Sequence, residues 1–430
     1  MTPAAVAALA AAPAMPVAGQ ATSHREQLSN GLVLLHTETG PSPTVAVCML
    51  VRAGAAAEPP GQAGLRQLLV RVLLDQRAAR GARLRATLAD LGARVSSDVT
   101  QDFVEVCVRA ASEDLEAALV LQRSLLLEPE FAAAAVARQR AALLSEAREE
   151  AGTLAARADR AAAAALYPGR ELGLPWVGPG DPLPEVSAAD LAAFHHGHFT
   201  VNRLVLSIAG AVPRRLASEA VRRQYGALLP GGAGAPPPPA LGAPTGPTTL
   251  NLPAEGDAAL VEVVGRAPAV DDDAAPATAM ALAVLGDGMG SRLYRTLREQ
   301  RGLAYTARSF TVPAAWGARA GVVVTCDQAQ ARVVSNLVQS EVDRVQEVLA
   351  TEEELGRAAQ YLVTQYRLAH QGNQGLAHAL GAFEVTAHRQ GYGWDRELPL
   401  RLRAVRAGEA REAARQLFAA AVTVRVGVPE

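Results

Sequence analysis

The feature that most constrains the fold is a run of Gly, Ala and Pro from Pro230 to Pro247, with four consecutive prolines at 236–239. Proline fixes one backbone angle and lacks an amide donor, so this run continues neither a helix nor a central strand. We therefore predict a semi-rigid linker over 230–247. It divides a chain of 430 residues, too long for one ordinary core, into halves of similar size.

The two halves show the same order of elements, running from a helix through strands into two further helices. The first half has a helical pattern over Leu84–Ala93, a strand over Phe103–Val108, and helices over Glu113–Leu127 and, rich in Ala, Phe131–Ala165. The second half has a helix over Leu293–Gly302, strands over Tyr305–Phe310 and Gly321–Thr325, and helices over Ala329–Leu349 and Thr351–His370. We expect an α+β fold of two homologous α/β half-domains, each a mainly antiparallel sheet covered on one face by helices.

The predicted domain boundaries follow from this division. The first 21 residues are rich in Ala and Pro and carry no charge, so they lack the basic region of a secretory signal. We expect a disordered extension over 1–22, an N-terminal domain over 23–229 and a C-terminal domain over 248–430.

Composition excludes several classes of partner. The formal net charge is −2, which provides no basic field for nucleic acid and no polybasic patch for a membrane surface. No run of about 20 apolar residues is long enough to span a bilayer. The sequence therefore predicts neither nucleic acid nor a membrane as a partner, and we expect a cytoplasmic, bacterial setting.

The three cysteines, Cys48, Cys107 and Cys326, each lie in a Val-rich segment typical of a strand. They are far apart in the sequence and odd in number. We expect small buried thiols in the reduced state, in preference to a metal cluster or a disulfide framework.

Five segments together resemble a known family, and they extend over nearly the whole chain. They are Leu28–Leu32, Val51–Gly54, Glu58–Leu65, Asp190–His195 and the block from Gly288 to Tyr305. In these segments the chain resembles the pitrilysin and mitochondrial processing peptidase group of zinc peptidases, the insulinase-type family. The resemblance implies the processing-peptidase half-shell fold.

Active members of that family carry an inverted zinc motif, His-x-x-Glu-His, shortly after the glycine that matches Gly64. The resemblance places Gln67, Val70 and Arg71 at the positions of the first His, the Glu and the second His. Gln67 offers a weak neutral oxygen, Val70 provides no carboxylate base, and Arg71 is a permanent cation. Glu146 matches the third ligand, but we interpret it as a surface or salt-bridged residue. We expect a degenerate site and no metal bound by this chain.

Three histidines at His195, His196 and His198 form the only other cluster that resembles a metal site in the sequence. They have no acidic or Cys companions, and their segment matches a family stretch that joins a helix to a strand. We favour a structural role for them.

The second-half motif is intact. In active relatives, the Arg and Tyr that match Arg298 and Tyr305 reach the catalytic chamber and hold the substrate around the scissile bond. A guanidinium and a phenol are suitable donors to the oxyanion that forms during peptide hydrolysis. We expect Gly302 to cap the preceding helix, so that Arg298 and Tyr305 converge across a short turn. The alternative is that Arg298 pairs with an acid and Tyr305 is half-buried packing.

The resemblance therefore implies a non-catalytic subunit of a two-chain zinc peptidase. The expected partner is a homologous chain with an intact His-x-x-Glu-His motif and a bound zinc ion, and the expected substrates are short peptides. The alternative is a binding or structural subunit without proteolysis, similar to the peptidase-derived core subunits of the respiratory bc1 complex. An independent hydrolase with another type of site has little support, because no Ser nucleophile motif, Cys/His pair or phosphate loop stands out.

Overall fold

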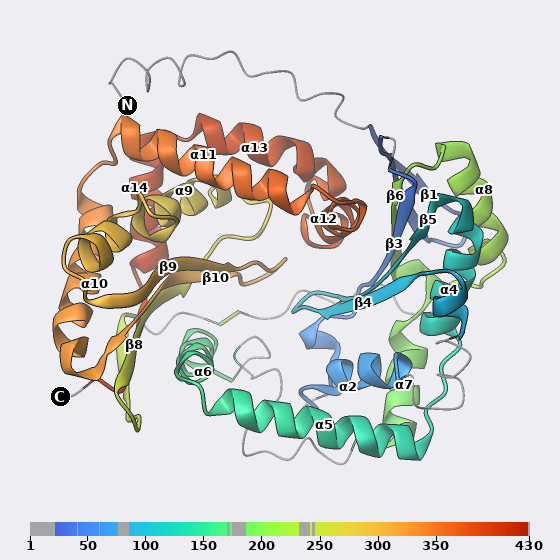
Figure 1. Ribbon diagram of the computed structural model, residues 1–430, viewed down its shortest axis with the longest axis horizontal. Helices are drawn as coiled ribbons and strands as arrows, with labels where there is room; N and C mark the ends of the chain where they lie inside the picture. Colours follow the sequence, from blue (N-terminus) through green and yellow to red (C-terminus); the bar gives the residue numbers. More distant parts are fainter. Residues whose placement is uncertain are drawn as a thin grey trace.

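A computed structural model describes residues 22–40, 42–59, 61–75, 86–169, 173, 186–231, 241–242 and 246–428. The predicted extension over 1–22 lies outside these residues except for Thr22, and most of the predicted linker over 230–247 lies outside them too. Figure 1 places two separate sheets on opposite sides of the molecule, with helices around and between them.

The first half contains a six-stranded sheet. Its strands are β1 (Ser23–Gln27), β2 (Val33–Glu38), β3 (Thr44–Val51), β4 (Arg94–Val99), β5 (Val104–Ala111) and β6 (Leu204–Gly210). The order is β1-β2-β6-β3-β5-β4, in which β2 and β6 run parallel and the other neighbours run antiparallel. The central strands β3 and β6 are rich in aliphatic residues and buried along nearly their whole length, as expected when both faces of a sheet are covered.

The second half contains a five-stranded sheet with the same plan. Its strands are β7 (Thr248–Leu252), β8 (Ala258–Arg266), β9 (Ala304–Val312), β10 (Arg319–Asp327) and β11 (Val422–Val426). The order β7-β11-β8-β10-β9, with β7 and β11 parallel, reproduces β2-β6-β3-β5-β4 of the first sheet strand for strand. The predicted α+β fold with two homologous, mainly antiparallel halves is confirmed.

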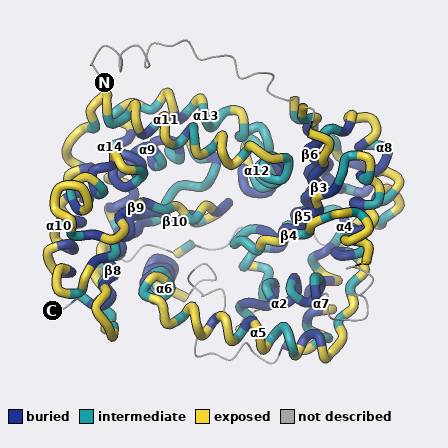
Figure 2. The backbone as a smooth tube through the Cα atoms, in the orientation of Figure 1, coloured by how far each residue is buried: buried dark blue, intermediate teal, exposed yellow. Residues whose placement is uncertain are grey.

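Helices pack against these sheets and against one another. Those of the first half are α2 (Leu65–Leu73), α4 (Leu115–Leu127), α5 (Ala133–Ala151), α6 (Leu154–Leu166), α7 (Ala188–His198) and α8 (Arg214–Tyr225). Those of the second half are α9 (Ala275–Gly286), α10 (Ala331–Glu347), α11 (Glu352–Ala369), α12 (Asn373–Thr386), α13 (Trp394–Ala404) and α14 (Ala407–Phe418). Figure 2 shows the outward sides of α10 and α11 exposed and β3 and β6 buried. Among the described helices, none combines the length and the apolarity needed to cross a bilayer.

Short helical turns complete the described secondary structure. They are Ala55–Ala57, Ser112–Asp114, Val201–Arg203, Gln328–Gln330 and Gly391–Gly393, a π-helical turn over Tyr294–Glu299, and a helical stretch over residues 86–90.

The long helix predicted over Phe131–Ala165 is wrong in its continuity. The chain forms α5 and α6 instead, with a break at Gly152 and Thr153. Gly152 weakens the helix, and the Thr153 hydroxyl accepts a hydrogen bond from the Ala156 amide, so a new helix begins there. The break turns α6 away from α5 and onto the other half of the molecule (Figure 1).

Each half contributes one helix to the sheet of the other. From the first half, Ala158, Ala162 and Leu166 of α6 pack against β8 and β11 of the second sheet. From the second half, Ala377 and Leu380 of α12 pack against β3 and β6 of the first sheet. Two apolar interfaces therefore join the halves: α6 of the first half packs on the second sheet, and α12 of the second half packs on the first sheet.

The prediction of three reduced cysteines is wrong for two of them. Cys48 on β3 and Cys107 on β5 form a disulfide, whereas Cys326 on β10 is free and buried. The antiparallel register of β3 and β5 sets Cys48 directly opposite Cys107, although 59 positions separate them in the sequence. Distance along the chain therefore gave no indication of the pairing.

Candidate functional site

The residues predicted to occupy degenerate zinc positions lie on α2 and α5. Helix α2 begins after Gly64, which has a backbone φ of 94°, a left-handed conformation that favours glycine. Gln67 and Arg71 follow one helical turn apart, and Val70 is buried in the core of the first half. The Arg71 guanidinium forms two hydrogen bonds with the Glu146 carboxylate of α5, the first with an Nη1–Oε1 distance of 2.9 Å.

These residues do not fit a zinc ion. The Glu146 carboxylate, at the position of the third ligand, is occupied by a guanidinium that stays protonated at every physiological pH. The hydrogen bonds from Arg71 lower the pKa of Glu146, so the pair stays ionised. Gln67 contributes one neutral oxygen, which has no hydrogen-bond partner among the described residues. Arg71 and Glu146 thus form a solvent-exposed ion pair, as the salt-bridged interpretation of Glu146 predicts.

Two of the three clustered histidines, His195 and His198, pack at the end of α7, and the third, His196, is exposed. His195 Nε2 lies 2.6 Å from the Leu126 carbonyl oxygen, and its ring stacks on Phe199. His198 Nδ1 lies 2.9 Å from the Phe194 carbonyl oxygen. The rings of His195 and His198 are thus held by backbone carbonyls and neighbouring aromatic rings, as the structural interpretation predicts for these two residues.

Arg298 lies in a distorted helical segment of the second half. The chain is helical from Arg292, and residues Tyr294–Glu299 form a π-helix, in which the Gln300 amide bonds the Arg295 carbonyl. Short π-helical segments occur frequently at functional sites. Gly302 ends the segment with a φ of 62°, and its amide bonds the Arg298 carbonyl at 3.2 Å. The predicted glycine cap is therefore present.

Arg298 and Tyr305 converge across this turn. Arg298 Nη1 donates to the Tyr305 carbonyl oxygen, and the guanidinium lies 5.7 Å from the Tyr294 ring centroid. Both side chains are exposed, with 54% of Tyr305 accessible. The Tyr305 hydroxyl donates to the Asp327 carboxylate at the end of β10, and this hydrogen bond is the main cause of the raised pKa of the phenol. Within the described residues no acid pairs with Arg298, so the alternative of a salt-bridged Arg and a half-buried Tyr is wrong.

An ion pair between the buried Arg292 and the partly buried Glu354 fixes the segment that carries Arg298. Arg292, at the start of the segment, forms a bidentate ion pair with Glu354 at 2.8 and 2.9 Å. Glu354 also closes the capping box of α11 with Thr351. The hydrogen bonds from Arg292 lower the pKa of Glu354 to about 2. The Thr296 hydroxyl adds a 3.0 Å hydrogen bond to Glu341 on α10.

The two groups of predicted site residues lie on different halves. Gln67, Val70, Arg71 and Glu146 belong to α2 and α5, whereas Arg298 and Tyr305 belong to the segment around β9 (Figure 1). Among the described residues, no hydrogen bond or ion pair connects the two groups. The structure therefore contains two separate pairs of predicted site residues. Arg298 and Tyr305 are exposed and adjacent, whereas Arg71 and Glu146 are bound to each other.

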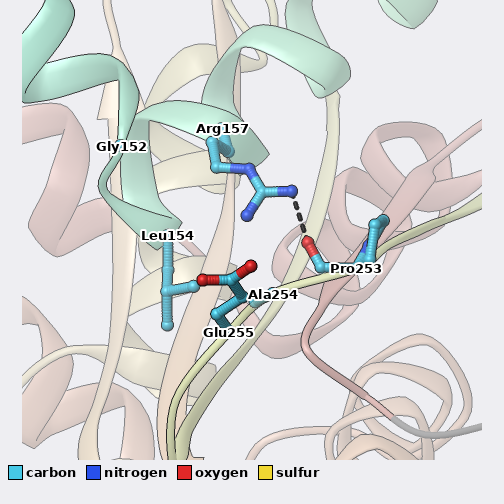
Figure 3. A pocket seen from close by; sticks show the side chains of 6 residues that line it. All are labelled: Gly152, Leu154, Arg157, Pro253, Ala254 and Glu255. Atoms are coloured by element: carbon cyan, nitrogen blue, oxygen red, sulfur yellow. Dashed lines mark hydrogen bonds between the residues drawn. The ribbon is translucent and has the colours of Figure 1, made fainter.

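An open pocket of about 460 Å³ lies at the junction of α5 and α6 (Figure 3). It is lined by Gly152, Leu154, Arg157, Pro253, Ala254 and Glu255. The Arg157 guanidinium donates to the Pro253 carbonyl, which attaches α6 to the segment after β7. None of the predicted site residues lines this pocket.

Sequence reasoning missed Asp327 and the Arg292–Glu354 pair. Asp327 contacts Tyr305 because β9 and β10 are antiparallel neighbours. Glu354 reaches Arg292 from a helix 62 positions further along the chain. The sequence held one signal for Glu354, the Thr-x-x-Glu capping box that begins at Thr351, but this signal predicts a helix start and no ion pair.

Comparisons with known proteins identify the family of this chain. Residues 33–180 match the model of the insulinase family, peptidase family M16, and residues 185–362 match the model described as the peptidase M16 inactive domain. An uncharacterized zinc protease of Streptomyces coelicolor is 26% identical over 85% of this chain and 81% of its own length.

Two eukaryotic relatives match about half of the chain. The mitochondrial-processing peptidase subunit beta of Blastocladiella emersonii is 25% identical over 48% of this chain and 45% of its own length. The cytochrome b-c1 complex subunit 1 of Caenorhabditis elegans is 26% identical over 43% and 39%.

The fold has a close counterpart among solved structures. A crystal structure of a peptidase M16 inactive domain from Pseudomonas fluorescens superposes with a TM-score of 0.84 at 19% identity, covering 95% of this chain and 98% of that one. The chain belongs to the M16 family of pitrilysin- and processing-peptidase-like proteins, as an inactive member.

Proposed function

We propose that this chain is the non-catalytic subunit of a two-chain zinc peptidase and supplies Arg298 and Tyr305 to the active site of a homologous partner. The observation that carries the proposal is a contrast between the two halves. The zinc positions are closed by the Arg71–Glu146 ion pair, while Arg298 and Tyr305 are exposed and adjacent.

The chemistry of the pair fits this role. Peptide hydrolysis passes through a tetrahedral intermediate whose former carbonyl oxygen carries negative charge. The Tyr305 hydroxyl and the free N–H groups of Arg298 can donate to that oxygen or to neighbouring peptide carbonyls. In the isolated chain the phenol donates to Asp327. When substrate is bound, Tyr305 exchanges this acceptor for the substrate oxygen.

The partner in this proposal is a homologous chain that carries an intact His-x-x-Glu-His motif and binds zinc. Its substrates are short peptides enclosed between the two chains, and the pair works in a bacterial cytoplasm. The match to a mitochondrial-processing peptidase subunit supports an assembly of homologous chains.

The test is co-expression of this chain with such a homologue, followed by copurification and digestion of a peptide library. We expect a stable complex that cleaves peptides, whereas each chain alone is inactive. Cleavage by the zinc-bearing chain alone, at the rate of the mixture, would contradict the proposal.

The match to cytochrome b-c1 complex subunit 1 favours a second candidate, a structural or peptide-binding subunit without proteolysis. A complex that forms but cleaves no peptide in the library would favour this second candidate.

A further inference from the structure

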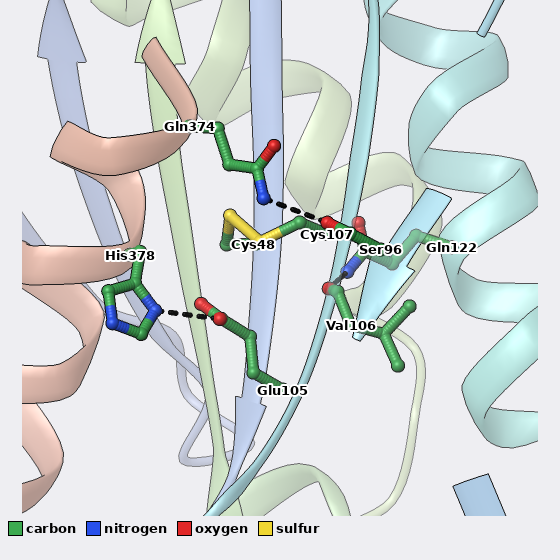
Figure 4. Close-up of a disulfide and its surroundings, with 8 residues drawn as sticks. All are labelled: Cys48, Ser96, Glu105, Val106, Cys107, Gln122, Gln374 and His378. Atoms are coloured by element: carbon green, nitrogen blue, oxygen red, sulfur yellow. Dashed lines mark hydrogen bonds and ion pairs between the residues drawn. A yellow bond between two sulfur atoms is a disulfide. The ribbon is translucent and has the colours of Figure 1, made fainter. Parts of the chain in front are cut away.

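A buried polar cluster lies where α12 of the second half covers the first sheet. The surrounding interface is apolar, built from residues such as Val33, Leu35, Leu50 and Leu380. Within it lie the disulfide of Cys48 and Cys107, which are 0% and 1% exposed, and the Glu105 side chain (Figure 4).

Glu105 is an unusual neighbour for a disulfide. It precedes Cys107 by two positions on β5, so both side chains project from the same face of the sheet. Its Oε2 atom accepts a hydrogen bond from His378 Nδ1 of α12 at 2.7 Å. Its Oε1 atom is buried and has no hydrogen-bond partner among the described residues. A buried carboxylate oxygen without a donor is costly, so this atom requires a positively charged or protonated neighbour.

The positions of these atoms match a small metal site. The two sulfur atoms and a carboxylate oxygen of Glu105 all lie within 4.8 Å of one another. Around tetrahedral zinc, with bonds of about 2.0–2.3 Å, ligand atoms lie roughly 3.3–3.8 Å apart. Once the sulfur–sulfur bond is opened, small side-chain rotations bring three ligands to this spacing.

We propose that the reduced form of this chain binds a thiophilic divalent cation, such as Zn²⁺, through Cys48, Cys107 and Glu105. His378 donates its ring N–H to Glu105 and orients it, a positioning role typical of groups behind metal ligands. Thiolates select zinc over harder cations such as Mg²⁺ or Ca²⁺. The site is separate from the M16 zinc positions and does not depend on the proposed peptidase function.

The chemical step is a two-electron reduction. A dithiol reductant transfers two electrons and two protons to the Cys48–Cys107 bond and is itself oxidised to a disulfide. The two thiols that result lose their protons to solvent when the cation binds. Because His378 lies on α12 and hydrogen-bonds Glu105, the bound cation also strengthens the contact between the two halves, which the disulfide between β3 and β5 does not bridge.

The experiment compares the full chain purified with its disulfide intact and the full chain purified throughout in a phosphine reductant that is removed before metal is added. Zinc per chain is measured after dialysis, and Co²⁺ serves as a spectroscopic probe. We expect one zinc per reduced chain, a thiolate-to-cobalt charge-transfer band, and neither in the oxidised chain.

Four variants assign the ligands. Cys48→Ser should abolish binding and the charge-transfer band. Glu105→Gln keeps both thiols and should weaken zinc binding at least about tenfold, and His378→Ala should weaken it by about 10–100-fold. Cys326→Ala removes the free buried thiol on β10 and should leave binding unchanged.

Near-UV circular dichroism checks that each variant is folded, and Glu105→Gln decides the matter if Cys48→Ser does not fold. Equal zinc in the oxidised and reduced chains would overturn the proposal. Undiminished affinity in Glu105→Gln would overturn it as well.

Discussion

At the scale of single residues, we propose that an ion pair takes the place of the metal that active relatives bind. Arg71, which we assign to a zinc-ligand position, has the Glu146 carboxylate as its partner. An arginine has no acceptor atom and no accessible neutral form, so this position cannot revert to metal binding by a change of pH. In this proposal the identity of the Arg71 side chain is itself enough to prevent zinc binding.

This account predicts the metal content of the M16 positions. The chain with its Cys48–Cys107 bond intact should hold no stoichiometric zinc after exhaustive dialysis. The double variant Gln67→His/Arg71→His frees Glu146 and places two imidazoles one turn apart, a His₂Glu set that should bind one zinc. Adding Glu146→Ala to the double variant should weaken that binding. Stoichiometric zinc in the oxidised wild-type chain, measured by elemental analysis, would contradict the account.

Residue identities at these sites could be read from the sequence, but their contacts could not. The resemblance to the family matched Gln67, Arg71 and Glu146 to zinc-ligand positions. The sequence also indicated that Glu146 is a surface or salt-bridged residue. Neither the Cys48–Cys107 bond nor the contact of Tyr305 with Asp327 could be read this way, because each depends on the register of two strands. Register is set by how the strands bury their side chains, and no local pattern in this chain encodes it.

At the scale of elements, the Arg/Tyr pair depends on a short π-helix held at both ends. Gly302 closes one end with its left-handed backbone, and Arg292 anchors the other through Glu354. The sequence predicted a helix over Leu293–Gly302 and its glycine cap. It did not predict the π-helical geometry, because that depends on the packing of the segment against α10 and α11.

Removing the anchor should destabilise the second half. Glu354→Gln leaves the buried Arg292 guanidinium without its ionic partner, and we expect a loss of about 2 kcal/mol in the free energy of unfolding. Glu353→Gln, in the same first turn of α11 but 74% exposed at its side chain, is the matched control and should change stability by less than about 0.5 kcal/mol. Urea denaturation measures both. A loss of stability in Glu354→Gln no larger than that in Glu353→Gln would contradict the role of the anchor.

The same ion pair predicts a pH dependence. The folded-state pKa of Glu354 is about 2, below its usual 4.5, so the contribution of this pair is complete above pH 4.5. It is lost as the pH falls from 4.5 towards 2, because protonation of Glu354 then accompanies unfolding. The stability difference between wild type and Glu354→Gln should therefore shrink over this window. A difference that stays constant from pH 6 to pH 3 would contradict the assigned cause.

At the scale of the whole molecule, α6 and α12 join the two halves by reciprocal packing. The duplicated sheets were predictable, because hydrophobic patterns repeat in both halves of the sequence. The exchange of helices was not predictable, because an apolar helix face does not specify which of two similar sheets it covers. The break at Gly152 and Thr153, which allows α6 to cross to the second sheet, was read as part of one long helix.

A pair of glycine substitutions tests the α12 interface. At Gly381 of α12, an added methyl group would lie 2.3 Å from a Leu50 side-chain atom on β3, so Gly381→Ala should destabilise the protein by roughly 1–2 kcal/mol. Gly356 of α11 has open space at the same position, and Gly356→Ala should stabilise by about 0.5–1 kcal/mol through helix propensity. Thermal unfolding measures both, and a stabilising effect of Gly381→Ala would contradict tight docking of α12.

The most direct test of the central claim, that this chain supplies Arg298 and Tyr305 to a partner's active site, is peptide cleavage by the two-chain complex with the zinc-bearing chain held wild type. Matched controls are Tyr294→Phe and Arg295→Ala, which change the same residue types within the same π-helix. Turnover and KM are measured at saturating and limiting peptide for complexes of equal stoichiometry.

We predict that Tyr305→Phe lowers turnover on the order of 10²-fold, as expected for loss of one oxyanion donor, and that Arg298→Ala lowers turnover or raises KM. Both variants should still bind the partner, because the two side chains are exposed, and both control variants should keep full activity. Wild-type cleavage by the Tyr305→Phe and Arg298→Ala complexes would contradict the claim.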